Sequence, residues 1–219
     1  MKKAVLIFLL LIVVLSENFG QTTPAESRKK MLKMQLDYRF KGGTYTFENI
    51  FYKTIKYPEV ARENCIQGII IASFNVTCDG KMSNVSLKNP LHYGIEDEVR
   101  KFFEVIKDKW NTCKDDKYVH FEIPIQFKLE GTEMNAEDAL FVFEDKNPGY
   151  ICRGDSYFLE KANKYLKKGN GKTAIEYLNV LIKRDPYNMK YYELKKQAVT
   201  MINKKKVKKK NKKKKKKQS

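Results

Sequence analysis

The segment from Tyr118 to Leu129 alternates strictly between apolar and polar side chains, and this pattern constrains the fold more than any other feature of the sequence. A period of two is typical of a β-strand with one buried face. Pro124 lies within the strand and has no backbone N–H, so we expect a sheet-edge strand, or a position whose missing donor faces outward. The predicted buried face consists of Val119, Phe121, Ile123, Ile125, Phe127 and Leu129.

Two more segments with period-two patterning precede this strand. They run from Ile69 to Thr77 and from Met82 to Lys88, and the Asp79-Gly80 pair between them indicates a tight hairpin. Apolar residues at helical spacing predict one helix before the hairpin, at Phe47, Ile50, Phe51 and Ile55. The same spacing predicts a second helix after the hairpin, at Ile95, Val99, Phe102, Ile106 and Trp110. The sequence therefore predicts an α+β fold in the order helix, β-hairpin, helix, β-strand, a three-stranded antiparallel sheet with helices on one face.

The N-terminus resembles a secretory signal. Lys2 and Lys3 precede twelve apolar residues, Ala4 to Leu15, which small and polar residues follow. A membrane-spanning helix needs roughly 20 apolar residues. We expect residues 1–20 to be a signal peptide cleaved between Ser16 and Gln21, and a retained membrane anchor is the alternative.

Four cysteines follow in the exported part of the chain, at Cys65, Cys78, Cys113 and Cys152. An even number in an exported protein permits zero, one or two disulfides. The sequence contains no Cys-x-x-Cys pair, and its two histidines are far apart, so no metal site is predicted.

The positive charge is concentrated at the C-terminus. Of the net charge of +18, twelve charges come from lysines between Lys204 and Lys217. Residues 203–219 are predicted to be a disordered tail. The tail has no interleaved aromatic residues, so no specific nucleic-acid binding is predicted. An anionic envelope surface is its candidate partner, and a solvated tail without a partner is the alternative.

Residues 155–202 have the pattern of an α-helical hairpin and resemble one tetratricopeptide repeat. The resemblance rests on Phe158, Ala162, Tyr165, Ala174, Leu178 and Pro186, with Gly169 near the turn. A plain helical hairpin without a ligand fits the same residues. Residues 130–154 are expected to be a linker, with one apolar patch from Leu140 to Phe143.

Residues 42–129 resemble the C-terminal domain of the TonB family. The residues that carry the resemblance are Gly42-Gly43, Tyr57-Pro58-x-x-Ala61, Gly68, Asp79-Gly80, Trp110 and Ile123-Pro124-Ile125-x-Phe127-x-Leu129. The proline that usually follows the tryptophan is missing. The family's long Pro-rich spacer is also missing, because the six prolines of the sequence do not cluster, and the lead-in of residues 21–41 would reach only roughly 70 Å even when fully extended. The resemblance therefore does not imply an energy-transducing role.

The TonB resemblance implies a periplasmic protein that binds protein partners, with outer-membrane transporters as the candidates and an inner-membrane anchored form as the alternative. The family captures an extended peptide by strand addition at a sheet edge. Here that edge would be the strand Tyr118 to Leu129, with Tyr57 and Pro58 near it. The predicted partner-binding residues are Tyr57, Pro58, Tyr118, His120, Glu122, Pro124, Gln126 and Lys128. An edge merely protected by Pro124 and its charges is the alternative.

The family topology also places the end of the first strand beside the start of the last. It therefore implies a Cys78–Cys113 disulfide, with Cys65 and Cys152 as the remaining pair.

The sequence does not predict an enzyme. We find no nucleophile with a base and no phosphate-binding loop, and the acidic run Glu96-Asp97-Glu98 falls in the first turn of a helix, where it offsets the helix dipole. No cofactor and no small-molecule substrate are predicted. The alternative function is a soluble periplasmic scaffold that binds through residues 155–202, and a homodimer formed by strand exchange remains open.

Overall fold

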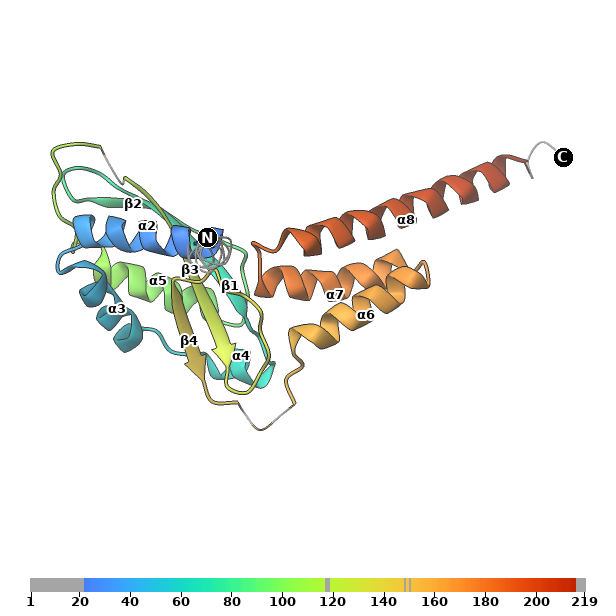
Figure 1. The fold of residues 1–219 in the computed structure, drawn as a ribbon, viewed down its shortest axis with the longest axis horizontal. Coiled ribbons are helices and arrows are strands. Elements are labelled where there is room, and N and C mark those ends of the chain that lie inside the picture. The colour runs from blue at the N-terminus through green and yellow to red at the C-terminus, as the bar shows by residue number, and fades with distance from the viewer. Residues whose placement is uncertain (1–21, 117–118, 148, 150, 216–219) are drawn as a thin grey trace, which may run out of the picture.

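The computed structural model describes residues 22–116, 119–147, 149 and 151–215. It contains a sheet with helices packed against it, and three further helices that project from one side of this body (Figure 1). The expected signal peptide, residues 1–20, lies outside the described residues. None of the described helices combines the length and the apolarity needed to cross a membrane.

The first body contains four helices and four strands. Its helices are α2 (Pro24–Arg39), α3 (Gly43–Thr54), α4 (Glu59–Glu63) and α5 (Ile95–Ile106). Its strands are β1 (Gly68–Val76), β2 (Met82–Lys88), β3 (His120–Leu129) and β4 (Phe141–Asp145). The order of the strands in the sheet is β2-β1-β3-β4. The mixed α+β class predicted from the sequence is therefore confirmed.

The sheet has one strand more than predicted. The hairpin β1–β2 and the pair β1–β3 are antiparallel, as expected, whereas β4 pairs in parallel with β3 from Ile125 opposite Phe141 to Leu129 opposite Asp145. β4 arises from the apolar patch that the sequence assigned to a linker. Five residues are too few to show a period of two, and the strand is stabilised by Phe141, whose ring stacks on Phe47 at 5.3 Å and on Phe51 at 5.1 Å.

The core lies between one face of the sheet and helices α3 and α5. Phe47 and Phe51 from α3 make edge-to-face contacts with Phe102 of α5, with ring centroids 5.1 and 5.4 Å apart. On the sheet side, Phe74 and Phe121 stack at 5.1 Å. These rings are 0–1 % exposed, so they form a large part of the apolar core of the domain.

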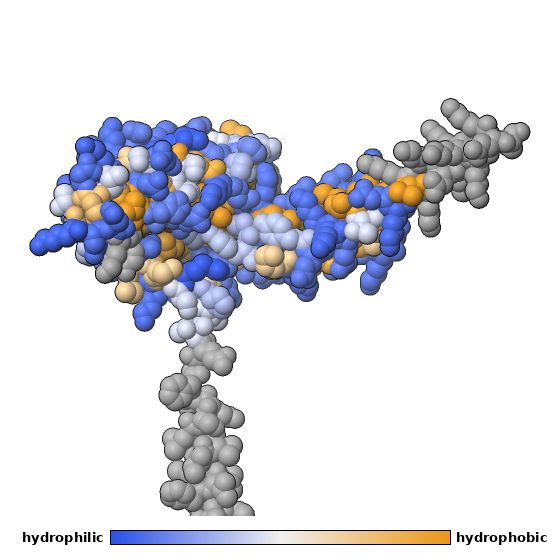
Figure 2. Space-filling view, turned by 90° about the horizontal axis from the view of Figure 1, so that it is seen from above, coloured by the Kyte–Doolittle hydropathy of each residue, from blue (hydrophilic) through white to orange (hydrophobic). Residues whose placement is uncertain are grey.

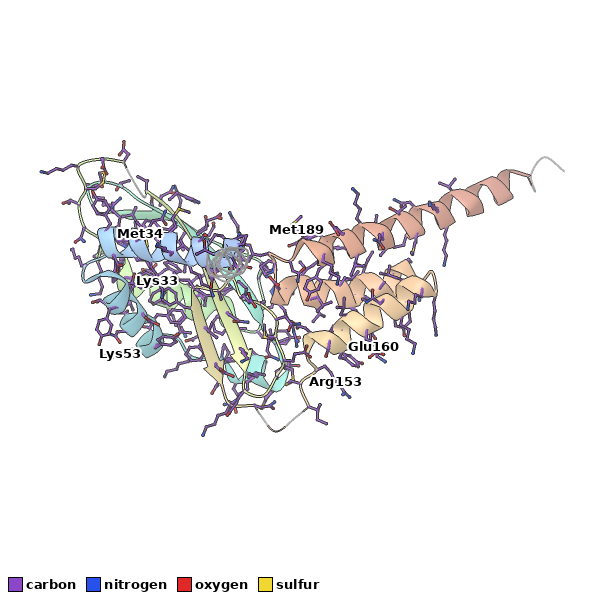
Figure 3. The ribbon with its side chains drawn as sticks, viewed as in Figure 1. Lys33, Met34, Lys53, Arg153, Glu160 and Met189 are labelled. Atoms are coloured by element: carbon purple, nitrogen blue, oxygen red, sulfur yellow. A yellow bond between two sulfur atoms is a disulfide. The ribbon has the colours of Figure 1, made fainter. Side chains whose placement is uncertain are left out.

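The expected lead-in forms α2, which packs onto this core. Thr23 and Glu26 form a reciprocal capping box at its start. At its end, the fully buried Arg39 donates a hydrogen bond to the Thr77 carbonyl at 2.8 Å, and Phe40 packs edge-to-face on Trp110. Exposed side chains such as Lys33 and Met34 cover the outer surface of the helix (Figure 3).

The second body consists of α6 (Asp155–Lys167), α7 (Gly171–Arg184) and α8 (Met189–Lys215). Ala162, Leu178 and Leu181 are fully buried and form a small core with Tyr191. A Cβ atom on Gly171 would lie 2.3 Å from the Ala198 carbonyl oxygen, so glycine permits the close approach of α7 and α8. The antiparallel pair α6–α7 fits the predicted helical hairpin, and its assignment as a tetratricopeptide repeat stays a prediction.

Helix α8 differs from the sequence prediction. It continues to Lys215, past the ends of α6 and α7, where a disordered tail was expected from residue 203 (Figure 1). Lysine has a high helix propensity, and neither Gly nor Pro interrupts this segment. The hydropathy view in Figure 2 shows hydrophilic residues over most of the first body and apolar residues gathered along parts of the helical body. The exposed apolar side chains of α8 include Met189, Val199 and Val207.

Both disulfides exist. Cys78 is bonded to Cys113, as the family resemblance implied, and Cys65 is bonded to Cys152. The second bond joins the end of α4 to the chain just before α6, so it ties the first body to the helical body.

Candidate binding surfaces

The strand predicted to be a free edge lies inside the sheet. β1 pairs with one side of β3 from Gly68 opposite Phe127 to Asn75 opposite His120, and β4 pairs with the other side from Ile125 to Leu129. In addition, the Leu140 N–H donates to the Pro124 carbonyl at 2.9 Å. The prediction of strand addition along this whole strand is therefore wrong, because the chain's own segment occupies most of that edge.

The start of β3 extends beyond β4 and lies beside α2. A cavity of about 230 Å³ separates the helix from this part of the strand. Residues lining it include Arg28, Leu32 and Gln35 from α2, and His120, Glu122 and Pro124 from β3. This short stretch of edge therefore has a helix alongside it.

Tyr57 and Pro58 do not form an exposed recognition surface. Tyr57 is 7 % exposed, its hydroxyl donates to the Ile66 carbonyl, and its ring packs edge-to-face on Phe127 at 5.6 Å. Burial raises the pKa of the Tyr57 hydroxyl well above its usual value. Pro58 is half-buried at the start of α4. Tyr57 thus serves the core, and Tyr118 lies outside the described residues.

The polar residues of β3 on the outer face already have partners within the sheet. His120 Nδ1 lies 2.7 Å from Asn75 Oδ1, and Lys128 forms an ion pair with Glu144 at 3.2 Å. Glu122 accepts a hydrogen bond from the Lys88 ammonium, which lowers the pKa of the Glu122 carboxyl.

Gln126 is 4 % exposed, and its side-chain amide lies 3.9 Å from the sulfur of Met134. A partner could reach these side chains only by replacing contacts that they already make.

Within the described sheet, β2 has one edge without a neighbouring strand. The Thr77 N–H donates to the Lys81 carbonyl at 3.0 Å. Because bonded and non-bonded pairs alternate along an antiparallel ladder, this bond shows which residues of β1 form hydrogen-bonded pairs with β2. Leu87 lies opposite Ala72 in the alternate, non-bonded position, so its N–H and C=O point away from β1. The edge is seven residues long and is interrupted by an irregularity near Asn84, whose φ is 57°.

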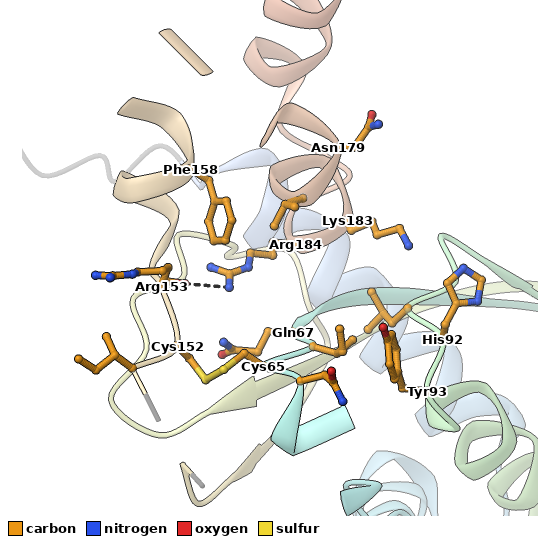
Figure 4. Close-up of a pocket in the computed structure, with 15 residues that line it drawn as sticks. Cys65, Gln67, His92, Tyr93, Cys152, Arg153, Phe158, Asn179, Lys183 and Arg184 are labelled. Carbon is orange, nitrogen blue, oxygen red and sulfur yellow. Dashed lines mark hydrogen bonds between the residues drawn. A yellow bond between two sulfur atoms is a disulfide. The ribbon is translucent and has the colours of Figure 1, made fainter. Parts of the chain in front are cut away.

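A cavity lies at the junction of the two bodies, and we call it the junction pocket. It has a volume of about 710 Å³ and lies between the Cys65–Gln67 corner, the Leu91–Tyr93 loop, the Ile151–Arg153 segment and helices α6 and α7 (Figure 4). None of the described residues that line it is acidic, whereas Arg153, Lys183 and Arg184 are basic. The lining therefore favours a negatively charged ligand.

A buried ion pair holds one wall of the junction pocket. Arg184 donates to Asp155 Oδ1 at 2.9 Å and to the Arg153 carbonyl at 2.9 Å, and it lies 4.8 Å from the centre of the Phe158 ring. The Asp155 and Arg184 side chains are only 1 % and 3 % exposed. The second oxygen of Asp155 accepts the Asn135 N–H at 2.9 Å.

The end of α7 is fixed directly to β1. Asn89 Nδ2 donates to the Ile69 carbonyl at 2.6 Å and to the Lys183 carbonyl at 2.9 Å. A Cβ atom on Gly68 would lie 2.4 Å from the same Lys183 oxygen, so only glycine fits this contact. The pocket therefore has walls held by hydrogen bonds, tight packing and a disulfide.

Residues 53–129 match the family model described as Gram-negative bacterial TonB protein C-terminal. The chain contains a TonB-family C-terminal domain. The matched span of this TonB-type domain runs from the end of α3 to the end of β3, so β4 and the helical body lie outside it.

The chain is also similar to the NMR solution structure of the TonB C-terminal domain, residues 194–285, from Helicobacter pylori. The identity is 17 %, the TM-score is 0.31, and the match covers 37 % of this chain and 88 % of that one. A comparison with curated proteins gave no match.

The sequence did not predict the junction pocket, whose lining residues come from three regions that no local pattern links. Gln67 belongs to the first predicted domain, Arg153 to the predicted linker and Lys183 to the predicted helical module. The one available signal was the leftover cysteine pair, Cys65 and Cys152, whose bond brings the first two of these segments together.

Proposed function

We propose that this chain is a periplasmic protein whose TonB-type domain binds a protein partner by strand addition at the free edge of β2. The observation that carries the proposal is the strand order β2-β1-β3-β4, in which β2 has an outer edge without a strand neighbour in the described sheet. A partner segment in extended conformation would gain main-chain hydrogen bonds there, and its alternating side chains would give selectivity. The family resemblance makes an outer-membrane transporter the candidate partner and transport across that membrane the process.

The β4 edge is less suitable for strand addition. β4 has only five residues, against seven for β2. The Tyr52 hydroxyl also donates to the Val142 carbonyl at 3.1 Å, so α3 already engages part of this strand.

The two disulfides support the location in the cell envelope. Disulfides persist in oxidising compartments such as the bacterial periplasm and are rare in the cytosol. Both bonds pair residues that are far apart in sequence, with separations of 35 and 87 residues. A cleaved signal peptide and an inner-membrane anchor stay alternatives for residues 1–20.

A second candidate function is that of a scaffold that binds through the helical body. It is favoured by the exposed apolar side chains on α8, where Met189 is 67 % exposed and Val207 is 57 % exposed. Contact between Lys204 to Lys217 and an anionic envelope surface, and homodimer formation, stay predictions beside both functions.

Site-specific photo-crosslinking in the native host tests the β2 proposal. Benzoylphenylalanine placed at Ser83 of β2 is expected to crosslink to an outer-membrane protein, whereas the same group at Tyr45, 77 % exposed on α3, should not. Leu87→Pro removes an N–H that points away from β1 and should abolish the crosslink. Leu87→Ala keeps that N–H while removing the same side chain, so it should retain the crosslink. Equal crosslinking from Ser83 and Tyr45, or an unaffected Leu87→Pro variant, would rule the β2 edge out.

A further inference from the structure

Gln67 has an unsatisfied hydrogen-bond donor at the junction pocket. The side chain is 4 % exposed, and its Oε1 accepts the Leu129 N–H at 2.8 Å, but its Nε2 has no hydrogen-bond partner within the described part of the chain. An unpaired buried donor costs about 1–3 kcal/mol. In Figure 4, Gln67 lies between the Cys65–Cys152 disulfide and the Arg184 guanidinium, at the inner wall of the pocket. A ligand oxygen at this position would satisfy the amide.

The charges around the pocket match a ligand with a negatively charged group. Arg184 is already paired with Asp155, which leaves Arg153 and Lys183 as the cations of the lining. Among the described residues, neither Arg153 nor Lys183 has an ion-pair partner. The Arg153 guanidinium lies 5.1 Å from the centre of the Tyr157 ring, a contact that positions the guanidinium without neutralising its charge.

The remaining lining is suited to an apolar group and a peptide backbone. Leu91, Phe158 and Val180 supply apolar surface, and Asn64 and Asn179 supply amide groups that can both donate to and accept from a main chain. The volume of about 710 Å³ is within the range of about 300–1,000 Å³ found for ligand sites. A carboxylate and an apolar side chain on one short backbone combine these requirements.

We propose that the junction pocket binds the C-terminal end of a polypeptide whose last residue is apolar. The terminal carboxylate accepts a hydrogen bond from Gln67 Nε2, and the last side chain packs on Phe158 and Val180. Lys183 and Arg153 point to opposite sides of the pocket in Figure 4, so they attract the carboxylate through the positive potential of the pocket and not through direct ion pairs. Asn64 donates to the Val60 carbonyl through Nδ2, and its Oδ1 can accept a main-chain N–H, which distinguishes a peptide end from a fatty-acid carboxylate. This site is separate from the β2 edge, so it does not depend on strand addition.

Fluorescence anisotropy with the disulfide-bonded full chain tests the proposal. The probes are N-terminally labelled Ser-Gly-Ser-Gly-Ala-X peptides, where X is Phe, Leu or Val, each with a free carboxylate and as the C-terminal amide. We expect at least one acid to bind about tenfold or more tightly than its amide, because the amide lacks the charge. Equal affinity of every acid and its amide, or no saturable binding of any acid up to about 1 mM, overturns the proposal. Decanoate that binds in the pocket more tightly than every peptide acid overturns it too.

Substitutions then assign the binding to the pocket. Lys183→Gln should weaken the acid peptide about three- to tenfold, whereas Lys172→Gln, at an exposed site on the same helix and outside the pocket, should leave affinity within twofold. Gln67→Glu keeps the oxygen that accepts the Leu129 N–H but replaces the donor by a second acceptor, so we expect a loss of tenfold or more. Binding that is unchanged in Lys183→Gln and Arg153→Gln contradicts the proposal even where Gln67→Glu fails to fold. In NMR spectra, the side-chain NH₂ signal of Gln67 should shift with the acid and not with the amide.

Discussion

Replacing Asp155 by Asn should destabilise the protein strongly, because this carboxylate is the counter-charge of a buried arginine. Asp155 and Arg184 lie 2.9 Å apart and are 1 % and 3 % exposed. The carboxylate also accepts the Asn135 N–H at 2.9 Å and lies in the first turn of α6, where a negative charge offsets the helix dipole. Asn retains the size of the side chain, so the substitution removes charge with little change in packing.

The magnitude follows from the uncompensated charge that remains. Removing one partner of a buried ion pair costs about 3–5 kcal/mol. Asn keeps one acceptor for Arg184, which places our expectation near the lower end, about 3 kcal/mol. With a denaturant dependence of about 2 kcal/mol per molar urea, the midpoint of unfolding should fall by roughly 1.5 M.

Urea denaturation followed by circular dichroism measures this change, and Trp110 fluorescence reports separately on the first body, since Trp110 is buried there. Asp108→Asn, at an exposed aspartate, is the matched control and should change the stability by less than about 0.5 kcal/mol. Adding Arg184→Met to Asp155→Asn should not lower the stability further, because it removes the unpaired charge. A loss below about 1 kcal/mol for Asp155→Asn would refute the reasoning.

The disulfides and one surface carboxylate give two more predictions. Replacing Cys65 and Cys152 by Ser should destabilise the protein by about 0.8 kcal/mol more than replacing Cys78 and Cys113. The first bond closes the longer loop, with a sequence separation of 87 against 35, and the chain-entropy model gives a larger stabilisation for a longer loop. Urea unfolding of the two double variants measures the difference, and an equal loss of stability would contradict the prediction. The lowered pKa of Glu122 means that its stabilising effect is present above the unfolded-state pKa of about 4.3 and is lost as pH falls through the folded-state pKa. Because the pair is exposed, Glu122→Gln should cost at most about 1 kcal/mol at pH 7 and nothing at about pH 2; a loss that persists in acid would point to packing instead of charge.

The sequence predicted the elements that carry long periodic patterns. The hairpin strands and the alternation through Leu129 appear in the structure with closely similar bounds. The helix predicted from Ile95 to Trp110 also appears, but it ends at Ile106, and Trp110 forms an isolated β-bridge with Phe40. The resemblance of these elements to a TonB-type domain also predicted the Cys78–Cys113 bond, which the structure contains. These features depend on local periodicity and on a known topology, so they are visible in one sequence.

The features that failed depend on contacts between distant segments. β4 is too short to be recognised from its own five residues, and it exists because Phe141 finds Phe47 and Phe51 across the core. Tyr57 was assigned to partner binding because it belongs to a family motif, whereas its hydroxyl and ring are both used in the core. The last helix was predicted to end near residue 202, because the low-complexity Lys-rich segment was expected to be disordered, whereas lysine has a high helix propensity and the helix continues to Lys215.

The segment between the two bodies shapes both of the proposed binding surfaces. As β4 it occupies the edge of β3, so an added strand would have to pair with β2 instead. A few residues later, Cys152 bonds to Cys65 and Asp155 pairs with Arg184, which fixes the helical body against the start of β1 and encloses the junction pocket. A TonB-type domain without this segment would have a free β3 edge and no such pocket. The two proposed binding surfaces therefore depend on residues outside the span that matches the TonB C-terminal family model.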